Sequence, residues 1–445
     1  MSEEAMERID LLIEHGLVVT CDRDDRVLDD GAVAIRDAKI VAIGPTHDLR
    51  GRFEAGEVID ARGAIVMPGL INVHTHTPMI LLRGLADDLP LESWLRCMRE
   101  ASGQVIDEEN VAYAAELAYV EMIRSGATTA LDMYFYPEAL ARSAQRTGFR
   151  LATGPVFVGS IGLDGLAPDQ RLERGRALLR SWQGSPLLIP CVMPHSTYDV
   201  PPDILLVAQA LADEFDALLS THAVETRNEV KTVTKLRGAP PIELLGRLNM
   251  LSPRTILAHG VHLTPEEIAE LARTRAVVVH CPMSNLKLGS GIAAVPEMMQ
   301  AGVRLALGTD GPASSNDLDL WHAMRMAALL HRGTHEDPAL TPARSIVRMA
   351  TCEGAAALGM GDRLGSLEPG KLADVILVDL RRSHLVPIFD VYSHLVYAVG
   401  RDDVSHVVIN GRVVLRDRCI TTVDERASIA TVQRIAGLIG ARQVC

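Results

Sequence analysis

The hydrophobic and polar positions follow two patterns, which separate a central region from two similar flanks. In the centre, about residues 68–364, apolar runs of strand character alternate with segments of helical periodicity. The expected strands are Ala64–Val73, Ala127–Met133, Arg150–Val158, Leu187–Met193, Ala217–His222, Thr255–His259, Ala276–His280 and Arg304–Leu307. Most gaps show helical patterns, for example Glu108–Arg124, Pro202–Phe215, Pro265–Arg273 and Leu318–Leu330. This α/β alternation predicts a (β/α)8 barrel of the TIM type.

An open, doubly wound sheet is the structural alternative for the centre. Such a sheet usually carries a glycine-rich phosphate loop after its first strand, and no such loop follows the first expected strand. The barrel is therefore favoured.

Both flanks of the chain contain short strands separated by Gly and Asp turns. In the C-terminal flank, "ADVILVDL" is one strand, and "HVVINGRVVLRD" is a hairpin around Asn410-Gly411. Each flank is too small to close a core of its own. We therefore expect one small β-sandwich domain built from both termini (residues 1–66 and 366–445, with a helix at the end), and a barrel domain over residues 67–365.

Composition and charge narrow the classes of partner. The chain has 445 residues, of which 48% are hydrophobic and 23% charged, as in ordinary globular proteins. A net charge of −13 without a basic block argues against nucleic acid or an anionic membrane as partner. The acidic start lacks the features of a signal peptide, and no segment reaches the ~20 apolar residues of a membrane span. The scattered cysteines argue against a disulfide framework, so we expect a cytoplasmic protein with a small-molecule substrate.

Histidines gather where the expected strands end. Together with two acids they form the set His74, His76, His195, His222, Glu225, His259, His262, His280 and Asp310. Because barrel strands converge at one rim, side chains far apart in the sequence meet there. In "INVHTHTPM", His74 and His76 stand two residues apart and are expected on one face of the strand.

Four of these residues are candidate metal ligands: His74, His76, His222 and Asp310. Three imidazoles and a carboxylate suit Zn²⁺ or Fe²⁺, and an open position lets the metal lower the pKa of bound water towards ~7. The fourth strand, "LLIPCVM", has no lysine or acid that could bridge a second ion. We therefore expect one divalent metal ion, Zn²⁺ ahead of Fe²⁺.

Three residues are the catalytic candidates: Glu225, His259 and Asp310. Glu225 is interpreted either as a proton shuttle beside the metal or as a charge at a helix N-terminus. Asp310 can accept a proton from water, and His259 can hydrogen-bond hydroxide or a developing oxyanion. His195 is a substrate contact or a buried structural histidine, whereas His262 and His280 are interpreted as structural.

Several segments resemble the amidohydrolase superfamily, and within it the branch of 5-methylthioadenosine/S-adenosylhomocysteine deaminases. The likeness covers nearly the whole chain, and its motifs are specific at the level of the superfamily. It is carried by "PGLINVHTHTPMILLRGLADDLPLESWL", "MPHSTYD", "THAVET", "HCPMSNLKLGSGIAAV", "LGTDGPASSNDLDL" and "GSLEPGKLADVILVDL".

The resemblance implies roles for individual residues. The metal ligands match His74, His76, His222 and Asp310, the proton shuttle matches Glu225, and the histidine that orients hydroxide matches His259. The implied substrate contacts are Trp94 in a lid after the first strand, His195 on the purine ring, Glu225, and Arg171 as a candidate for a carboxylate. The implied enzyme removes the exocyclic amine of an adenine-type nucleoside hydrolytically, releasing ammonia, and assembles as a homo-oligomer.

One departure from the family keeps other substrates open. The lid glutamate that grips the ribose hydroxyls is replaced by Gly103, and the nearest acid is Glu100. An unpaired sugar hydroxyl costs affinity, so a sister enzyme acting on a pterin, a guanine-like base or a triazine is the alternative. A barrel reduced to a binding module would be free to lose Glu225 or Asp310, and both are present.

Overall fold

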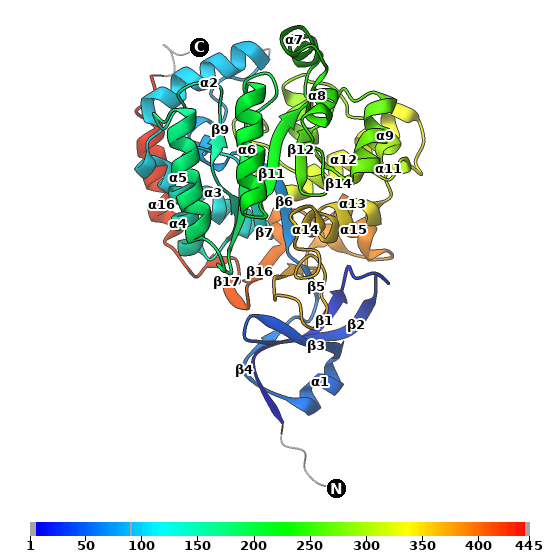
Figure 1. Cartoon of the computed structure of the whole chain (residues 1–445). Helices are drawn as coiled ribbons and strands as arrows, with labels where there is room; N and C mark the ends of the chain where they lie inside the picture. The colour runs from blue at the N-terminus through cyan, green and yellow to red at the C-terminus, as the bar shows by residue number, and fades with distance from the viewer. Residues whose placement is uncertain (1–5, 90, 441–445) are drawn as a thin grey trace.

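The computed structural model describes residues 6–89 and 91–440, and it consists of two sheets with their helices (Figure 1). The first is a set of eight parallel strands hydrogen-bonded in chain order. These are β6 (Leu70–Thr75), β7 (Ala127–Asp132), β8 (Arg150–Thr153), β10 (Leu188–Pro194), β11 (Leu218–Ala223), β12 (Thr255–His259), β13 (Val277–His280) and β14 (Arg304–Leu307), and the short β9 (Val156–Phe157) pairs with β10. The predicted barrel is thus confirmed.

The barrel closes between its first and last strands through Asn72. The side-chain amide of Asn72 donates to Thr309 Oγ1 at 2.7 Å, and its Oδ1 accepts the Thr309 backbone N–H at 3.1 Å. Two residues further along, the Asp310 N–H donates to the His74 carbonyl oxygen at 3.0 Å. This seam places the ends of β6 and β14 side by side.

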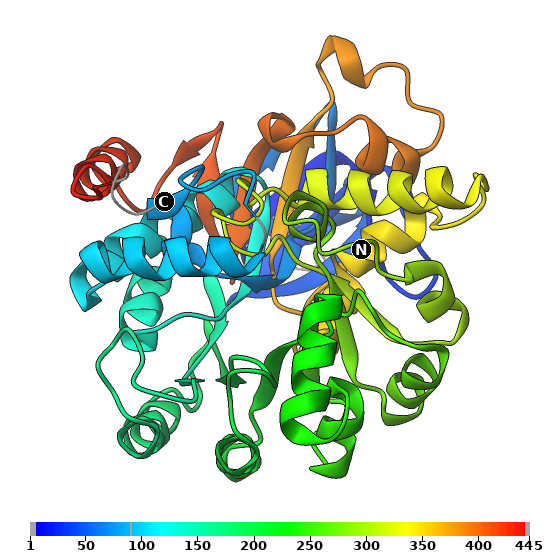
Figure 2. The ribbon, with the colours of Figure 1, turned by 90° about the horizontal axis from the view of Figure 1, so that it is seen from above.

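Helices surround the barrel strands, as the view from above shows (Figure 2). They are α2 (Leu91–Val105), α3 (Glu108–Arg124), α4 (Pro137–Thr147), α5 (Pro168–Ser181), α6 (Pro202–Glu214), α7 (Arg227–Arg237), α8 (Pro241–Arg247), α9 (Pro265–Thr274), α10 (Pro282–Lys287), α11 (Val295–Gln300), α12 (Leu320–His335), α13 (Ala343–Met349), α14 (Cys352–Ala357) and α15 (Val391–Tyr397), with 3-10 turns at Thr77–Leu82, Ser383–Leu385 and Arg401–Asp403. Within the described ranges, no helix has the length and apolar character that crossing a membrane requires.

The second sheet combines strands from both ends of the chain. Its members are β1 (Glu7–Val19), β2 (Val27–Arg36), β3 (Lys39–Pro45), β4 (Phe53–Asp60), β5 (Ala64–Pro68), β15 (Val375–Asp379), β16 (Val404–Ile409), β17 (Arg412–Arg416) and β18 (Cys419–Ile420), with α1 (Thr46–Arg52) beside β3. The early part of β1 pairs with β4 and its late part with β5, so β1 passes between two halves of one continuous sheet. Both halves contribute to one apolar core, which includes Ile13, Val33, Val66 and Leu377.

We propose the division into residues 1–66 with 366–445 and residues 67–365, because the two sheets share no strand. The terminal sheet lies beneath the barrel, at the end away from α2 (Figure 1). The C-terminal helix α16 (Glu425–Ala436) packs on α3, where Ser428 Oγ donates to Glu116 at 2.8 Å. A buried ion pair joins barrel and sheet: Arg150 Nη2 lies 2.9 Å from Asp374 Oδ1.

Two expected strands differ from the structure. The apolar run Ala64–Val73 forms two strands, because its first half is β5 of the terminal sheet and its second half is β6 of the barrel. Gly69 separates them, and a Cβ there would lie 2.2 Å from the Thr128 side chain, so the close approach needs glycine. The expected strand Arg150–Val158 is likewise interrupted, between β8 and β9.

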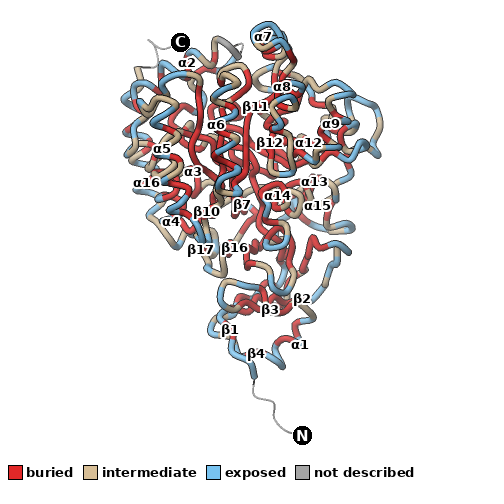
Figure 3. The backbone as a smooth tube through the Cα atoms, viewed as in Figure 1, coloured by how far each residue is buried: buried red, intermediate tan, exposed pale blue. Residues whose placement is uncertain are grey.

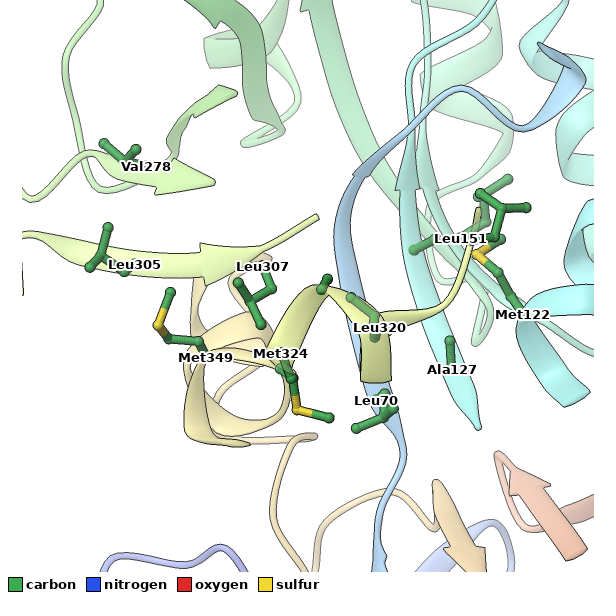
Figure 4. Packing of buried hydrophobic residues seen from close by; sticks show 14 of the residues in the cluster. Leu70, Met122, Ala127, Leu151, Val278, Leu305, Leu307, Leu320, Met324 and Met349 are labelled. Carbon is green, nitrogen blue, oxygen red and sulfur yellow. The ribbon is translucent and has the colours of Figure 1, made fainter. Parts of the chain in front are cut away.

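The barrel strands are buried, and the exposed residues lie mainly on the outer helices and loops (Figure 3). Alternate residues of a strand belong to different apolar clusters: Val277 and Val279 to one, and Val278 to the other. This two-residue alternation is that of a strand buried on both faces. Leu305 and Leu307 of β14 lie near Met324 and Met349 of the helices (Figure 4).

Cys97 on α2 is disulfide-bonded, unlike Cys21, Cys191, Cys281, Cys352 and Cys419, which are free thiols.

Candidate active site

His74 and His76 reach the site from the end of β6, where the strand contains a bulge. Between the pairs Asn72–Ala130 and Thr75–Asp132, β6 advances three residues while β7 advances two. Such an extra residue re-aims the side chains that follow it. The imidazoles of His74 and His76 lie edge to face with centroids 4.8 Å apart, and His74 is fully buried.

Asp310 follows β14 and meets these histidines across the barrel seam. Its Oδ1 lies 3.2 Å from His76 Nε2 and 3.5 Å from His74 Nε2. Its Oδ2 accepts hydrogen bonds from Ser284 Oγ at 2.6 Å and Ser314 Oγ at 2.7 Å. Burial disfavours the charged carboxylate, but the contacts with His74 and His76 hold the pKa of Asp310 well below its ordinary value. The site therefore holds a buried negative charge.

His222 comes from the end of β11, and its tautomer is fixed by the protein. Its Nδ1 lies 2.6 Å from the His195 carbonyl oxygen, which only accepts, so Nδ1 carries the proton. The same holds for His76, whose Nδ1 donates to the Met133 carbonyl at 2.6 Å. The two Nε2 atoms that remain face each other at 3.1 Å, and both are unprotonated when the rings are neutral. Burial opposes protonation of His76, but its contact with Asp310 raises its pKa.

Two facing lone pairs repel each other unless a cation lies between them. Neutral histidines that ligate a metal ion direct their lone pairs at a shared cation in this way. His74 fits the same purpose, because neither of its ring nitrogens has a hydrogen-bond partner among the described residues. Burial lowers the pKa of His74 to about 4 and that of His222 well below its usual value, so both rings are neutral, as ligands must be. The residues present therefore fit a divalent metal ion.

The candidate ligand atoms form one compact group. One ligand atom each from His74, His222, His259 and Asp310 lies within 4.8 Å of the others, and His76 adjoins two of them. The structure thus brings together all four residues that the sequence predicts as ligands, and it adds His259 at their side. Imidazole and carboxylate donors of this kind suit zinc and other borderline divalent metals.

Glu225 and His259 lie together at the edge of this group. Glu225 Oε2 is 3.9 Å from His259 Nε2, and Glu225 Oε1 accepts a hydrogen bond from Ser290 Oγ at 3.1 Å. Asn285 Oδ1 lies 2.8 Å from His259 Nδ1 and orients the ring. Burial opposes protonation of His259, but the charges of Glu225 and Asp310 raise its pKa.

The backbone is strained at the same place. His259 and Asp310 have φ of 77° and 59°, and Val224, next to Glu225, has φ of 57°. A positive φ is unfavourable for a non-glycine residue, and most of all for a β-branched one. Glu229 holds the strained segment by accepting the Val224 and Glu225 N–H groups at 3.0 and 2.6 Å. Such strain concentrates at functional sites.

A cavity of about 340 Å³ opens over these residues. It is lined by His76, His222, Glu225, His259 and Asp310, and by side chains from α2, the segment 156–163 and the loop after β10. Trp94 and His195, both predicted substrate contacts, line it too, and the Trp94 Nε1–H has no partner among the described residues. Its volume and largely apolar walls suit a small organic molecule.

Arg171 does not line this cavity. Its guanidinium makes a two-pronged ion pair with Asp164, at 2.8 and 2.7 Å, in a separate small pocket. Gly103 lies one residue beyond the cavity-lining Ser102, and a Cβ there would meet no atom within 4 Å. Neither residue holds a substrate in this arrangement, so the sequence-based role of Arg171 remains only a hypothesis.

Sequence reasoning missed four residues of the site. Asn285 and Ser290 orient His259 and Glu225, and Arg99 and Asp199 line the cavity. The motifs "HCPMSN" and "HSTYD" contain Asn285 and Asp199, but nothing in the letters says where these side chains point. Burial lowers the pKa of His195 to about 4, the Asp199 charge opposes this shift, and the Arg99 charge adds to it.

Two further histidines lie outside the catalytic group. His262 Nε2 donates a hydrogen bond to the Ser290 carbonyl oxygen at 2.8 Å, so this nitrogen carries a proton. His280 is buried beside His331, with ring centroids 5.5 Å apart.

A second acidic group also lies outside the catalytic group. It consists of Asp317 and Asp319, whose carboxylates contact the Arg401 guanidinium at 2.7 and 3.1 Å.

Fold and site together define a (β/α)8 barrel with a candidate centre for a divalent metal at the C-terminal ends of its strands. The chain matches the Amidohydrolase family over residues 65–414, and residues 31–53 match an imidazolonepropionase-like composite domain of bacteria. It therefore belongs to the amidohydrolase family.

Relatives of known name agree with this membership. A 5-methylthioadenosine/S-adenosylhomocysteine deaminase from Syntrophobacter fumaroxidans is 41% identical over 97% of this chain and 99% of its own. The structure of a zinc-bound adenosine deaminase from Xanthomonas campestris superposes with a TM-score of 0.95 at 39% identity, covering 98% and 99% of the two chains. A zinc complex of the atrazine chlorohydrolase TrzN from Arthrobacter aurescens gives 0.87 at 27% identity, over 96% and 100%.

Proposed function

We propose that the protein is a metal-dependent hydrolytic deaminase of adenine-type nucleosides. Its substrates are of the 5-methylthioadenosine, S-adenosylhomocysteine or 5′-deoxyadenosine class, and its products are ammonia and an inosine-type nucleoside. The observation that carries the proposal is the pair of Nε2 atoms of His76 and His222, 3.1 Å apart beside Asp310, with Glu225 at the edge of the same cavity. The names of the relatives support adenine nucleosides over pterins, guanine-like bases and triazines.

We assign His74, His76, His222 and Asp310 as the ligands of one divalent ion, with zinc expected. Zinc in the Xanthomonas campestris and Arthrobacter aurescens structures supports this choice. When bound, the ion supplies an activated water at neutral pH. The Nδ1–H hydrogen bonds of His76 and His222 keep both rings oriented for it.

Proton movement is assigned to three residues. Asp310 accepts a proton as water oxygen bonds to the ring carbon that carries the amine. Glu225 donates a proton to the neighbouring ring nitrogen, which lets the ring take up the electron pair of the attacking oxygen. His259, held by Asn285, hydrogen-bonds that oxygen as its charge develops. Asp310 then passes its proton to the amine, and the carbon–nitrogen bond breaks to release ammonia. The hydroxyl on the ring carbon returns its proton to Glu225, which leaves the carbonyl of the inosine-type product.

Binding and orientation are assigned to the cavity walls. His195 faces the substrate with its imidazole ring. Trp94 offers an indole N–H that has no hydrogen-bond partner among the described residues, so both residues are assigned to orienting the purine. Met79, Met98 and Phe135 add apolar contact and exclude water from the reacting centre. Excluding water strengthens each charge interaction inside the cavity.

The test is a deamination screen with zinc-loaded protein. The ultraviolet spectrum of the adenine ring changes on deamination, so methylthioadenosine, S-adenosylhomocysteine and 5′-deoxyadenosine are compared directly, with ammonia release measured in parallel for a pterin, guanine and an aminotriazine. We expect activity on the nucleosides and little on the free rings. Activity confined to the free rings would replace the proposal with the sister function.

We also propose that the enzyme is cytoplasmic and assembles as a homo-oligomer acting on small molecules. The family resemblance supports the assembly. Light scattering coupled to gel filtration of the purified protein tests it, and a monomeric mass across the working concentration range would reject it.

A further inference from the structure

One face of the α2 helix forms a wall of the substrate cavity. The residues on that face are Trp94, Leu95, Met98, Arg99 and Ser102, whose spacing of three or four places them on one side of the helix. Four of them are apolar or neutral. Arg99 is the exception: of the described residues that line the cavity, it is the sole arginine or lysine.

Arg99 has no hydrogen-bond or ion-pair partner among the side chains that the structure describes. Among residues 6–89 and 91–440, no hydrogen bond or ion pair to its guanidinium is found, although most arginines of the chain are paired with acids. The side chain is exposed toward solvent at the helix surface while it also faces the cavity. A guanidinium offers five donors in a planar fork, which suits a carboxylate held by two parallel hydrogen bonds.

A carboxylate of opposite sign lines the same cavity. Asp199, on the loop between β10 and α6, has its Oδ2 3.9 Å from His195 Nδ1. Arg99 and Asp199 both act on His195, yet they lie more than 4.0 Å from each other and form no ion pair. The cavity is therefore lined by a cation and an anion that are not paired with each other.

Apolar side chains line the same cavity. Leu95 and Met98 of α2 face the cavity, as do Ile161 and Leu163 of the loop after β9, and Ile161 is 69% exposed. An exposed isoleucine at a cavity mouth suits contact with an aliphatic chain. Arg171, which the resemblance offered for a carboxylate, is already satisfied by Asp164.

We propose that Arg99 and Asp199 select nucleosides whose 5′ substituent ends in an α-amino acid. Arg99 binds the carboxylate, Asp199 binds the ammonium group, and the apolar wall holds the thioether chain between them. The inference rests on the proposed function, and it assigns to the lid helix a specificity role that Arg171 cannot fill. Neither residue is among the assigned metal ligands or proton-transfer groups, so both determine which tail is accepted.

Three substrate probes distinguish recognition of the tail carboxylate from recognition of the tail ammonium group. All are 5′-thioethers of 5′-deoxyadenosine: the methylthio compound carries no charge, a carboxypropylthio compound carries the carboxylate alone, and the homocysteine compound carries carboxylate and ammonium. kcat/KM is measured for each with zinc-loaded wild type, Arg99→Met and Asp199→Asn. Arg96→Met is the matched control, because Arg96 is an exposed arginine of the same helix that does not line the cavity.

We expect Arg99→Met to lower kcat/KM about 10- to 100-fold for both carboxylate-bearing probes, as loss of a charge-assisted hydrogen bond implies. The methylthio compound should change less than about threefold. Asp199→Asn should weaken the homocysteine compound alone, and Arg96→Met should match wild type. Equal losses on all three probes, or no loss on any, would overturn the assignment.

A binding measurement keeps the inference separate from the proposed chemistry. Dissociation constants for the three probes are taken by calorimetry on zinc-loaded Glu225→Gln protein, with and without Arg99→Met. If the probes bind with the expected order but no ammonia is released by wild type, the deaminase proposal fails while the tail assignment stands. If methylthioadenosine is deaminated but the carboxylate gives no Arg99-dependent gain in affinity, the tail assignment fails alone.

Discussion

His76 and His222 direct their Nε2 atoms at each other, 3.1 Å apart, from strands that are far apart in the sequence. Each ring is held this way by a hydrogen bond from Nδ1–H to a carbonyl oxygen, of Met133 for His76 and of His195 for His222. In the neutral form of each ring, no proton lies between the two nitrogens while these bonds persist. The geometry therefore stabilises a cation at this point and is unfavourable without one.

Removing the metal should destabilise the protein as well as inactivate it. Dialysis against a chelator is expected to lower the melting temperature and abolish turnover, and one equivalent of Zn²⁺ should restore both, because an ion that binds the native state stabilises it by mass action. Calorimetry and elemental analysis follow the two effects. His222→Ala should take up less zinc than wild type. A chelated protein that keeps its melting temperature would contradict the assigned ligands.

Glu225→Gln should remove most activity while metal binding remains. Glutamine keeps the shape of the side chain but cannot donate the proton, and such a loss is typically about 10²- to 10⁴-fold in kcat. Ser290→Ala is the graded comparison, since it removes only the hydrogen bond to Glu225 Oε1 and should cost roughly tenfold or less. Zinc content of each variant is measured first. Turnover of the glutamine variant at the wild-type rate would reject Glu225 as the proton donor.

Gly103→Glu should shift preference toward nucleosides that carry both ribose hydroxyls. A side chain fits there, because a Cβ would meet no atom within 4 Å, and the position follows the cavity-lining Ser102. We expect kcat/KM for adenosine to rise relative to 2′-deoxyadenosine by about tenfold, the worth of one hydrogen bond to a charged group. Gly103→Ala is the control for helix propensity, which alone contributes about 0.5–1 kcal/mol. An identical ratio in both variants would show that the introduced carboxylate does not reach the sugar.

The alternation of apolar runs and helical segments predicts the barrel, because strands buried on both faces leave long hydrophobic runs and end at histidines. The residues His74, His76, His222 and Asp310 could be predicted for the same reason: barrel strands end at one rim. The run Ala64–Val73 could not be divided from the letters, since both halves are apolar and Gly69 is needed only for its approach to Thr128. The ion pair of Arg171 with Asp164 could not be predicted from the letters, because it depends on loop conformation, which hydrophobic patterns do not encode.

The ion pair between Arg150 and Asp374 should contribute strongly to stability. Both side chains are buried, with guanidinium-to-carboxylate contacts of 2.9 and 3.2 Å, and Asp374 also accepts the Asn410 N–H at 2.8 Å. Asp374→Asn leaves the Arg150 charge buried without a counter-charge, which typically costs about 3–5 kcal/mol. Chemical denaturation measures the loss. Asp379→Asn, which affects an ion pair with the exposed Arg381, should change stability by less than about 1 kcal/mol.

Restoring charge balance tests the reason for that loss. The double variant Arg150→Met with Asp374→Asn removes both charges, and it should be more stable than Asp374→Asn alone because no buried charge is left unpaired. If the double variant is as unstable as the sum of the two single variants, the effect of Asp374 lies in its backbone contacts instead.

The buried pair of His280 and His331 should make the protein sensitive to acid. All four ring nitrogens lack hydrogen-bond partners among the described residues, and burial lowers the pKa of His280 to about 3 and that of His331 to about 4. His335 also lowers the pKa of His331, and Glu297 opposes this. Above the ordinary pKa of 6.5, neither the native nor the unfolded state holds the extra proton. Protonation of the two rings therefore does not change the free energy of unfolding in that pH range.

As the pH falls below 6.5, the unfolded chain takes up a proton at each ring while the native state does not, so stability declines toward pH 4. Each such proton contributes about 1.4 kcal/mol per pH unit. His331→Leu should therefore flatten the decline between pH 6 and 4.5 by about that slope, as measured by denaturant unfolding of wild type and variant at several pH values. His47→Gln, at an exposed position, is the control and should leave the slope unchanged. Parallel pH curves for wild type and His331→Leu would show that His331 is protonated or paired in the native state.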